Sequence, residues 1–245
     1  MSPPPLDGEV EVLADATALA ERAAAMVAAE ATASLRERGA FAIALSGGST
    51  PKAMHQLLTR PPYRDRIDWS RWSVYFGDER ACPPDDAESN YRMARETLLD
   101  HVPIRPDRVY RMRGEGADLD AAASEYSSLL EATLPAGPGG PRLDLVLLGL
   151  GTDGHTASLF PGTPALDVTG AWATRGHATY APYDRITATF PLLTAAAAIG
   201  FLVAGASKRD ALAGVVAGTV PAARVKPAYG RLRWLLDREA AGGEG

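Results

Sequence analysis

Cysteine is almost absent from this sequence: Cys82 is the only one among 245 residues, which excludes an internal disulfide bond. Such sparing use of cysteine is typical of proteins in a reducing compartment, and we expect a cytoplasmic location. No apolar run approaches the ~20 residues that a membrane-spanning helix needs. Residues 1–7 also lack the basic region and the apolar core of a signal peptide. We therefore expect no interaction with a membrane.

Positive charge is also in short supply, with 25 Lys and Arg against 30 Asp and Glu and a net charge of −5. Non-specific nucleic-acid binding needs a basic surface, so we expect no nucleic-acid partner. The four histidines and the single cysteine have no metal-ligand spacing, and we expect no metal. His55 falls within a predicted helix and is interpreted as a surface residue.

The remaining composition is ordinary for a globular protein, with 46% hydrophobic and 22% charged residues. A chain of this length buries a core without disulfide or metal crosslinks. We predict one domain over residues 1–245, with frayed ends at about 1–7 and 240–245. The sequence does not fix the oligomeric state, and the expectation is a monomer or a weak homo-oligomer.

Strand and helix signals alternate along the chain. Strands are predicted at 9–13, 41–45, 73–76, 109–111, 143–148 and 199–203, and helices at 15–38, 51–58, 90–100, 118–133, 192–198 and 208–217. Residues 135–141 are predicted as a loop, and residues 234–241 as either strand or helix. The alternation predicts an α/β fold with a mostly parallel sheet flanked by helices. Extended segments at 172–179 and 185–189 predict a small antiparallel addition.

The strongest functional signal lies where an apolar strand, Leu143–Leu148, runs into a glycine-rich turn that carries Asp153 and His155. Open α/β sheets bind ligands at the carboxyl ends of their strands, so His155 is the histidine best placed for chemistry. Gly149–Gly154 also matches the dinucleotide fingerprint G-x-G-x-x-G. That fingerprint needs a long helix next, whereas the short helix expected here is stopped by Pro161, which disfavours a nicotinamide or flavin cofactor.

A second turn lies between a strand and a helix with Pro51 at its first position, and it consists of Ser46, Gly47, Gly48, Ser49 and Thr50. Its glycines allow an anion to approach, its hydroxyls donate hydrogen bonds, and the helix N-terminus carries partial positive charge. The turn therefore predicts a phosphate site; the alternative is a tight turn capped by Thr50.

Two nucleophiles compete with this interpretation. Residues 44–48 nearly match the nucleophile elbow G-x-S-x-G, which would make Ser46 a nucleophile with His155 as its base. Cys82 is a further candidate, although no strand-to-helix turn presents it.

Charged residues follow other strands. Asp78, Glu79 and Arg80 lie at the end of the strand at 73–76 and suit the binding of sugar hydroxyls; the alternative is a solvated loop. We favour a functional role for Asp78 and Arg80 and leave Glu79 and Asn90 open. Further cations that would complete a phosphate clamp, if they converge, are Arg185 and Lys208.

Together these segments resemble the 6-phosphogluconolactonases, within a wider family that includes the glucosamine-6-phosphate deaminases. The matching motifs come in family order and lie at 45–51, 78–80, 89–90, 149–162, 185–187 and 205–208. Deaminases carry a glutamate where this chain has Phe160, and Asp-Glu-Tyr where it has Asp78-Glu79-Arg80. The resemblance therefore favours the lactonases, with a deaminase or isomerase-type sugar-phosphate enzyme as the alternative.

The resemblance implies a modified Rossmann-like α/β fold with neither a metal nor an organic cofactor. The implied reaction is hydrolysis of 6-phospho-D-glucono-1,5-lactone to 6-phosphogluconate, in the oxidative pentose phosphate pathway, and the partner is this small lactone. A non-catalytic sugar-phosphate sensor is a third hypothesis, but a sensor need not keep the Asp153–His155 pair that this chain has.

The hypothesis also assigns roles to residues. His155 acts as general base on a water, and Asp153 or Asp78 orients the imidazole or binds sugar hydroxyls. Arg80, or backbone amides of the glycine turn, stabilises the oxyanion. The loop 46–50 and the cations Arg185 and Lys208 hold the remote phosphate.

Overall fold

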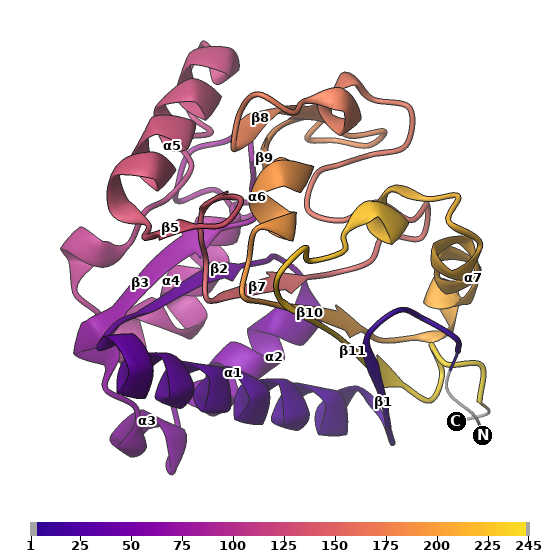
Figure 1. Cartoon of the computed structure of the whole chain (residues 1–245), viewed down its shortest axis with the longest axis horizontal. Coiled ribbons are helices and arrows are strands. Elements are labelled where there is room, and N and C mark those ends of the chain that lie inside the picture. The colour runs from indigo at the N-terminus through magenta and orange to yellow at the C-terminus, as the bar shows by residue number, and fades with distance from the viewer. Residues whose placement is uncertain (1–3, 244–245) are drawn as a thin grey trace.

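The computed structural model describes residues 4–243, which form a six-stranded sheet with helices on both faces and a smaller sheet beside it (Figure 1). The large sheet has the strand order β1-β11-β10-β7-β2-β3, and all its pairings are parallel. Its strands are β1 (Glu9–Leu13), β2 (Phe41–Leu45), β3 (Trp72–Phe76), β7 (Leu145–Leu148), β10 (Ala198–Val203) and β11 (Arg231–Asp237). The predicted α/β fold is confirmed.

The helices connect successive strands. They are α1 (Ala16–Arg38), α2 (Ser49–Leu58), α3 (Tyr63–Arg66), α4 (Asn90–Thr97), α5 (Leu119–Thr133), α6 (Phe190–Thr194) and α7 (Arg209–Ala217). Asp15 caps α1 by accepting a hydrogen bond from the Ala18 amide, and Gly39 ends it in the left-handed conformation. Among the helices of residues 4–243, none is long and apolar enough to cross a lipid bilayer.

The alternation of side chains along each strand divides the interior into two cores. In β2, Phe41 and Ile43 face the core that α1, α2 and α4 cover, whereas Ala42 and Ala44 face the core that α5, α6 and α7 cover. Figure 1 shows α1 and α2 along one face of the sheet and α5 and α6 on the opposite face. Burial on both faces explains why the sequences of the central strands β2, β7 and β10 are continuously apolar.

The order of the strands creates a switch point between β2 and β7. From β2 the chain continues to β3 at one edge of the sheet, whereas from β7 it continues to β10 on the other side. The loops that leave β2 and β7 therefore diverge at the carboxyl end of the sheet and leave a crevice between them. This crevice is where the two glycine-rich turns of the sequence meet.

The small antiparallel sheet has one strand more than predicted. It has the order β4-β9-β8, with β4 at Asp78–Arg80, β9 at Asp184–Ala188 and β8 at Ala173–His177. No separate strand was predicted after β3, but residues 78–80 pair with β9 so that Asp78 lies opposite Thr187 and Arg80 opposite Arg185. A three-residue strand made of charged residues has no local sequence signal, since only the distant β9 defines it.

Several other boundaries differ from the prediction. Thr50 lies inside α2 and does not cap it, since α2 begins at Ser49 with no side-chain cap. Residues 155–160 form turns with no helix, and α4 ends at Thr97. The remaining differences are a single bridge at Val109 in place of a strand, a two-stranded pair β5 (Ala136–Gly137) and β6 (Gly140–Pro141) in place of a loop, α6 at Phe190–Thr194, and β11 as a strand.

The predicted frayed ends are partly packed. Leu6 and Ala240 are buried in the core on the α5 side of the sheet. Burial of these two side chains opposes fraying at their positions. Of the predicted frayed residues, 1–3 and 244–245 lie outside the described part of the chain.

His55 was predicted at the surface but is completely buried, because α2 packs against both α1 and α4. Its Nδ1 lies 3.0 Å from the Thr97 hydroxyl, and within residues 4–243 its Nε2 has no hydrogen-bond partner. Burial lowers the pKa of His55 to about 4, because the interior disfavours the imidazolium.

Stability should therefore depend on pH through His55. Well above pH 6.5 neither state binds the proton, and as the pH falls from 6.5 toward 4 mainly the unfolded state does. We expect the free energy of unfolding to drop by about 2 kcal/mol between pH 7 and pH 5 because of this group. Urea denaturation of His55→Asn, which retains a polar group at the Nδ1 position, should show a drop smaller by that amount.

The control is His101→Asn, because His101 is exposed. An equal pH dependence in wild type and His55→Asn would contradict the prediction.

Candidate active site

A cavity of about 290 Å³ lies at the carboxyl ends of the central strands, where β2, β7 and β10 end. It brings together nearly all the residues that the sequence predicted for a site. Those that line it are Ser46, Gly47, Gly48, Ser49, Thr50, Asp78, Arg80, His155, Arg185 and Lys208. Asp153 is the one predicted residue outside the lining, and its carboxylate contacts Nδ1 of His155.

The loop after β2 presents backbone and hydroxyl donors to this cavity. Gly48 adopts a φ of 109°, which L residues rarely reach, and the first turn of α2 follows directly. Gly47 packs so closely that a Cβ there would lie 2.1 Å from Asn90 Oδ1. Within residues 4–243 the buried Ser46 Oγ has no hydrogen-bond partner. A buried hydroxyl without a partner is costly, and it suits a ligand that accepts its hydrogen bond.

Asp153 and His155 form a pair in the turn after β7. His155 Nδ1 lies 2.5 Å from Asp153 Oδ1, and the His155 amide donates to the same oxygen at 3.1 Å. Partial burial opposes ionisation of Asp153, but the hydrogen bonds from His155 outweigh it and lower the pKa of that carboxyl. With Nδ1 held by a carboxylate, Nε2 is the nitrogen left to accept a proton.

Neighbouring residues fix the position of the imidazole. A Cβ on Gly151 would lie 2.0 Å from His155 Nδ1 and 2.7 Å from Asp153 Oδ1, so only glycine fits at this position. On its other side the ring stacks on Phe160, with centroids 4.1 Å apart. The half-exposed Tyr180 packs edge-on against Phe160 and also lines the cavity.

Two arginines stand side by side because β4 pairs with β9. Residues directly opposite in an antiparallel pair share one face of the sheet, and like charges there are destabilising. Arg185 is only 2% exposed, and burial followed by the charge of Arg80 lowers its pKa. Arg80 also donates to the Glu88 carbonyl. Among the described residues, Nε of both Arg80 and Arg185 is buried with no partner, which suits an anionic ligand.

Lys208 adds a third cation from the turn after β10. It lies in a short 3-10 helix, Ala206–Lys208, before α7. Burial lowers the pKa of its ammonium group, and the charge of Asp153 opposes that shift. The cavity thus holds three cationic side chains with the Asp153 carboxylate close to one of them.

Asp78 does not contact His155 by a hydrogen bond; other residues hold it. Its Oδ2 accepts from Ser158 Oγ at 2.6 Å and its Oδ1 from Asn90 Nδ2 at 3.2 Å. The Ser158 amide donates to Thr187 Oγ1, which ties this arrangement to β9. Of the two acids considered from the sequence, Asp153 is the one placed against the imidazole.

The competing hypotheses find little support in this geometry. Ser46 Oγ has no partner among the described residues, so the Ser46–His155 pair of a serine nucleophile is not formed. Cys82 does not line the cavity, and burial followed by the charges of Glu79 and Asp86 raises the pKa of its thiol to about 11. The turn at 149–154 leads into no helix, whereas a dinucleotide site requires one directly after this turn. Within residues 4–243, no three His, Cys, Asp or Glu side chains are grouped to hold a metal ion.

Sequence reasoning left out four side chains that line or support the cavity. Asn90 was left open, and Ser158, Thr187 and Tyr180 were not identified as site residues. Ser158 lies within the motif that carries His155, so its proximity in sequence was a usable signal. Thr187 lies in β9 and Tyr180 in the segment between β8 and β9, so both reach the cavity region only because the small antiparallel sheet forms.

The fold and the cavity define an α/β protein with a cluster of cationic side chains at the switch point of its sheet. The family model "Glucosamine-6-phosphate isomerases/6-phosphogluconolactonase" matches residues 14–234. The chain is 40% identical to the 6-phosphogluconolactonase of Nostoc sp. over 241 residues, which cover 96% of this chain and 97% of that one. It is 42% identical to the 6-phosphogluconolactonase of Synechocystis sp. over 238 residues, covering 95% and 96%.

A solved structure of 6-phosphogluconolactonase from Trypanosoma brucei is also similar, with a TM-score of 0.86 at 30% identity over 96% of this chain and 98% of that one. The chain therefore belongs to the glucosamine-6-phosphate isomerase and 6-phosphogluconolactonase family.

The close packing of Gly151 yields a test of the imidazole geometry. In Gly151→Ala the added methyl group should push His155 and Asp153 apart and release the ring from its single tautomer. The ¹⁵N chemical shifts of His155, measured at alkaline pH, should change from a protonated Nδ1 to a mixture of tautomers.

Gly149→Ala, in the same turn, is the matched control, because a Cβ there meets nothing within 4 Å. A Gly151→Ala spectrum identical to that of wild type would show that the contact does not hold the ring.

Proposed function

We propose that this chain is a 6-phosphogluconolactonase, which opens 6-phospho-D-glucono-1,5-lactone to 6-phosphogluconate with a water activated by His155. The observation that carries the proposal is the meeting, in one cavity, of an Asp153–His155 pair with three cationic side chains, those of Arg80, Arg185 and Lys208. The named relatives of the family support the same reaction.

In this mechanism His155 is the general base. Asp153 accepts from Nδ1, so Nε2 takes a proton from water as the water oxygen attacks the lactone carbonyl carbon. The carbonyl oxygen becomes an oxyanion, which Arg80 or the amides of the glycine turn stabilise. The ring C–O bond then breaks, and the proton on Nε2 passes to the departing oxygen, leaving a carboxylic acid and a hydroxyl.

Asp78 has a separate task in the proposal. Ser158 and Asn90 each donate to one of its oxygens, which leaves further acceptor capacity on the carboxylate toward the cavity. It therefore accepts hydrogen bonds from sugar hydroxyls. Asp153, by contrast, orients the imidazole and supports its positive charge in the transition state.

The phosphate lies at the other end of the cavity in the proposal. The loop 46–50 offers amides and hydroxyls at the N-terminus of α2, and Arg185 and Lys208 supply charge. Binding energy from this remote group holds the ring for attack and so lowers the barrier at the carbonyl.

Deamination of glucosamine 6-phosphate is the weaker alternative. Isomerisation between an aldose and a ketose needs acid–base groups beyond one imidazole. At position 160, where the deaminases carry glutamate, this chain has a buried phenylalanine stacked on the imidazole. The apolar ring supplies no proton transfer.

We further propose that the lactone is the only partner of the site, that the chain is a monomer or a weak homo-oligomer, and that it acts in the cytoplasm. The single cysteine supports a reducing compartment, and the acidic net charge of −5 argues against nucleic acid.

His155→Ala should lower kcat by about 10²- to 10⁴-fold with a KM close to that of wild type, because the base acts in the transition state while the phosphate still binds. The assay couples freshly made lactone to 6-phosphogluconate dehydrogenase and subtracts spontaneous hydrolysis. His101→Ala, at an exposed histidine, is the control. A His155→Ala protein that keeps most of the rate, or clear turnover of glucosamine 6-phosphate by wild type, would overturn the proposal.

Lys208→Met should raise KM for the phosphorylated lactone roughly 10- to 100-fold, the loss expected for one charge-assisted hydrogen bond. The rate with unphosphorylated gluconolactone should stay unchanged. Arg185→Met should behave in the same way if it folds. Lys226→Met is the control, since Lys226 forms an exposed ion pair with Asp7. Unchanged KM values in both variants would remove these cations from the phosphate site.

A further inference from the structure

Glu79 is a buried acid next to the cavity that the proposed mechanism does not use. Side chains alternate along β4, so Asp78 and Arg80 line the cavity while Glu79 points to the opposite side. Its side chain is only 3% exposed. Removing a carboxylate from water costs free energy, so a buried acid needs hydrogen-bond donors around it.

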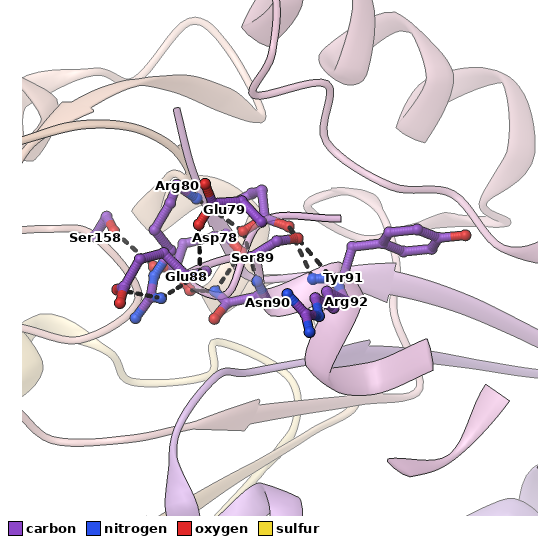
Figure 2. Close-up of polar contacts among 10 residues, drawn as sticks. Asp78, Glu79, Arg80, Glu88, Ser89, Asn90, Tyr91, Arg92 and Ser158 are labelled. Carbon is purple, nitrogen blue, oxygen red and sulfur yellow. Dashed lines mark hydrogen bonds and ion pairs between the residues drawn. The ribbon is translucent and has the colours of Figure 1, made fainter. Parts of the chain in front are cut away.

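Four donors surround the Glu79 carboxylate, and none of them is a charged group. Oε1 accepts from the amides of Arg80 and Asn90, both at 2.8 Å. Oε2 accepts from the Tyr91 amide at 2.8 Å and the Ser89 hydroxyl at 3.0 Å (Figure 2). Burial raises the pKa of Glu79, and these hydrogen bonds oppose the shift. The carboxylate thus joins β4 to the first residues of α4.

Asn90, whose backbone amide donates to Glu79, contacts both Asp78 and the loop 46–50 with its side chain. Its side-chain amide donates to the Asp78 carbonyl at 2.9 Å and to Asp78 Oδ1 at 3.2 Å (Figure 2). Its Oδ1 lies against Gly47, where a Cβ would be only 2.1 Å away. One side chain therefore sets the distance between Asp78 and the loop 46–50.

We infer that Glu79 is a positioning residue that acts through Asn90 to hold Asp78 and the loop 46–50 at the spacing of the two ends of the substrate. The inference rests on the proposed function, in which Asp78 binds the sugar and the loop binds the phosphate. In this proposal Glu79 itself contacts neither the sugar nor the phosphate, since its side chain lies on the side of β4 away from the cavity.

Glu79→Gln tests this role. Glutamine has one acceptor oxygen and an NH₂ group that would face amide donors, so two of the four hydrogen bonds are lost. We expect kcat/KM for the phosphorylated lactone to fall about 10- to 100-fold, with kcat reduced and KM raised, because small misplacements of binding groups are costly. Glu96→Gln, at an exposed acid on α4, should keep wild-type values.

A double-mutant cycle with Asn90→Ala separates positioning from general stability. If Glu79 acts through Asn90, the double variant should be no slower than Asn90→Ala alone. Additive losses, or wild-type kcat/KM in folded Glu79→Gln, would overturn the inference. Urea denaturation establishes that each variant is folded.

If Glu79→Gln does not fold, Ser89→Gly takes its place in the same cycle. This substitution removes one donor and keeps the carboxylate, and glycine is tolerated at an N-cap. The expected and contradicting outcomes are the same, with a smaller loss.

Binding of inorganic phosphate, measured by calorimetry, keeps this test separate from that of the proposed function. It should weaken in Glu79→Gln and stay unchanged in Glu96→Gln, whether or not the wild type hydrolyses the lactone. An inactive wild type would end the proposed function alone, whereas equal phosphate affinity in Glu79→Gln and wild type would end the inference alone.

Discussion

The register between β4 and β9 is the constraint on which the cavity depends. It sets Arg80 opposite Arg185 and Asp78 opposite Thr187, and Thr187 in turn holds the Ser158 amide. Because side chains alternate with a period of two, a slip by one residue would turn Arg80 and Asp78 away from the cavity and bring Glu79 toward it. The chemistry proposed for the turn after β7 therefore rests on a pairing formed far from that turn in the sequence.

Positive side chains outnumber negative ones in the lining of the cavity, with Arg80, Arg185 and Lys208 against Asp78. Two neighbouring arginines and a partly buried lysine raise the local positive potential, and Asp153 lies near the lysine. The two arginines that face each other oppose folding, because like charges directly opposite in a sheet are destabilising. The uniformly apolar strands beneath the cavity and the two cores of the sheet offset this cost.

Sequence reasoning succeeded where the signal was local. The turns at 46–50 and 149–155 each follow an apolar strand, so the parallel sheet by itself brings them to one edge. The prediction from sequence failed where a distant segment decides the structure. Residues 78–80 became a strand only by pairing with 185–187, and His55 became buried because α1 and α4 both pack against α2. Thr50 likewise lost its expected role as a cap because α2 starts at Ser49, two residues before the expected first position at Pro51.

Among residues 4–243, Nε of Arg80 and Nε of Arg185 have no hydrogen-bond partner, and this has a consequence for the stability of the protein. An anion that meets them binds the folded chain and not the unfolded one, so it raises stability in proportion to the logarithm of its concentration. Chains that unfold transiently are removed by proteases, and small changes in stability alter abundance several-fold. Under the proposed function, the protein should therefore unfold least often when its phosphorylated substrate is abundant.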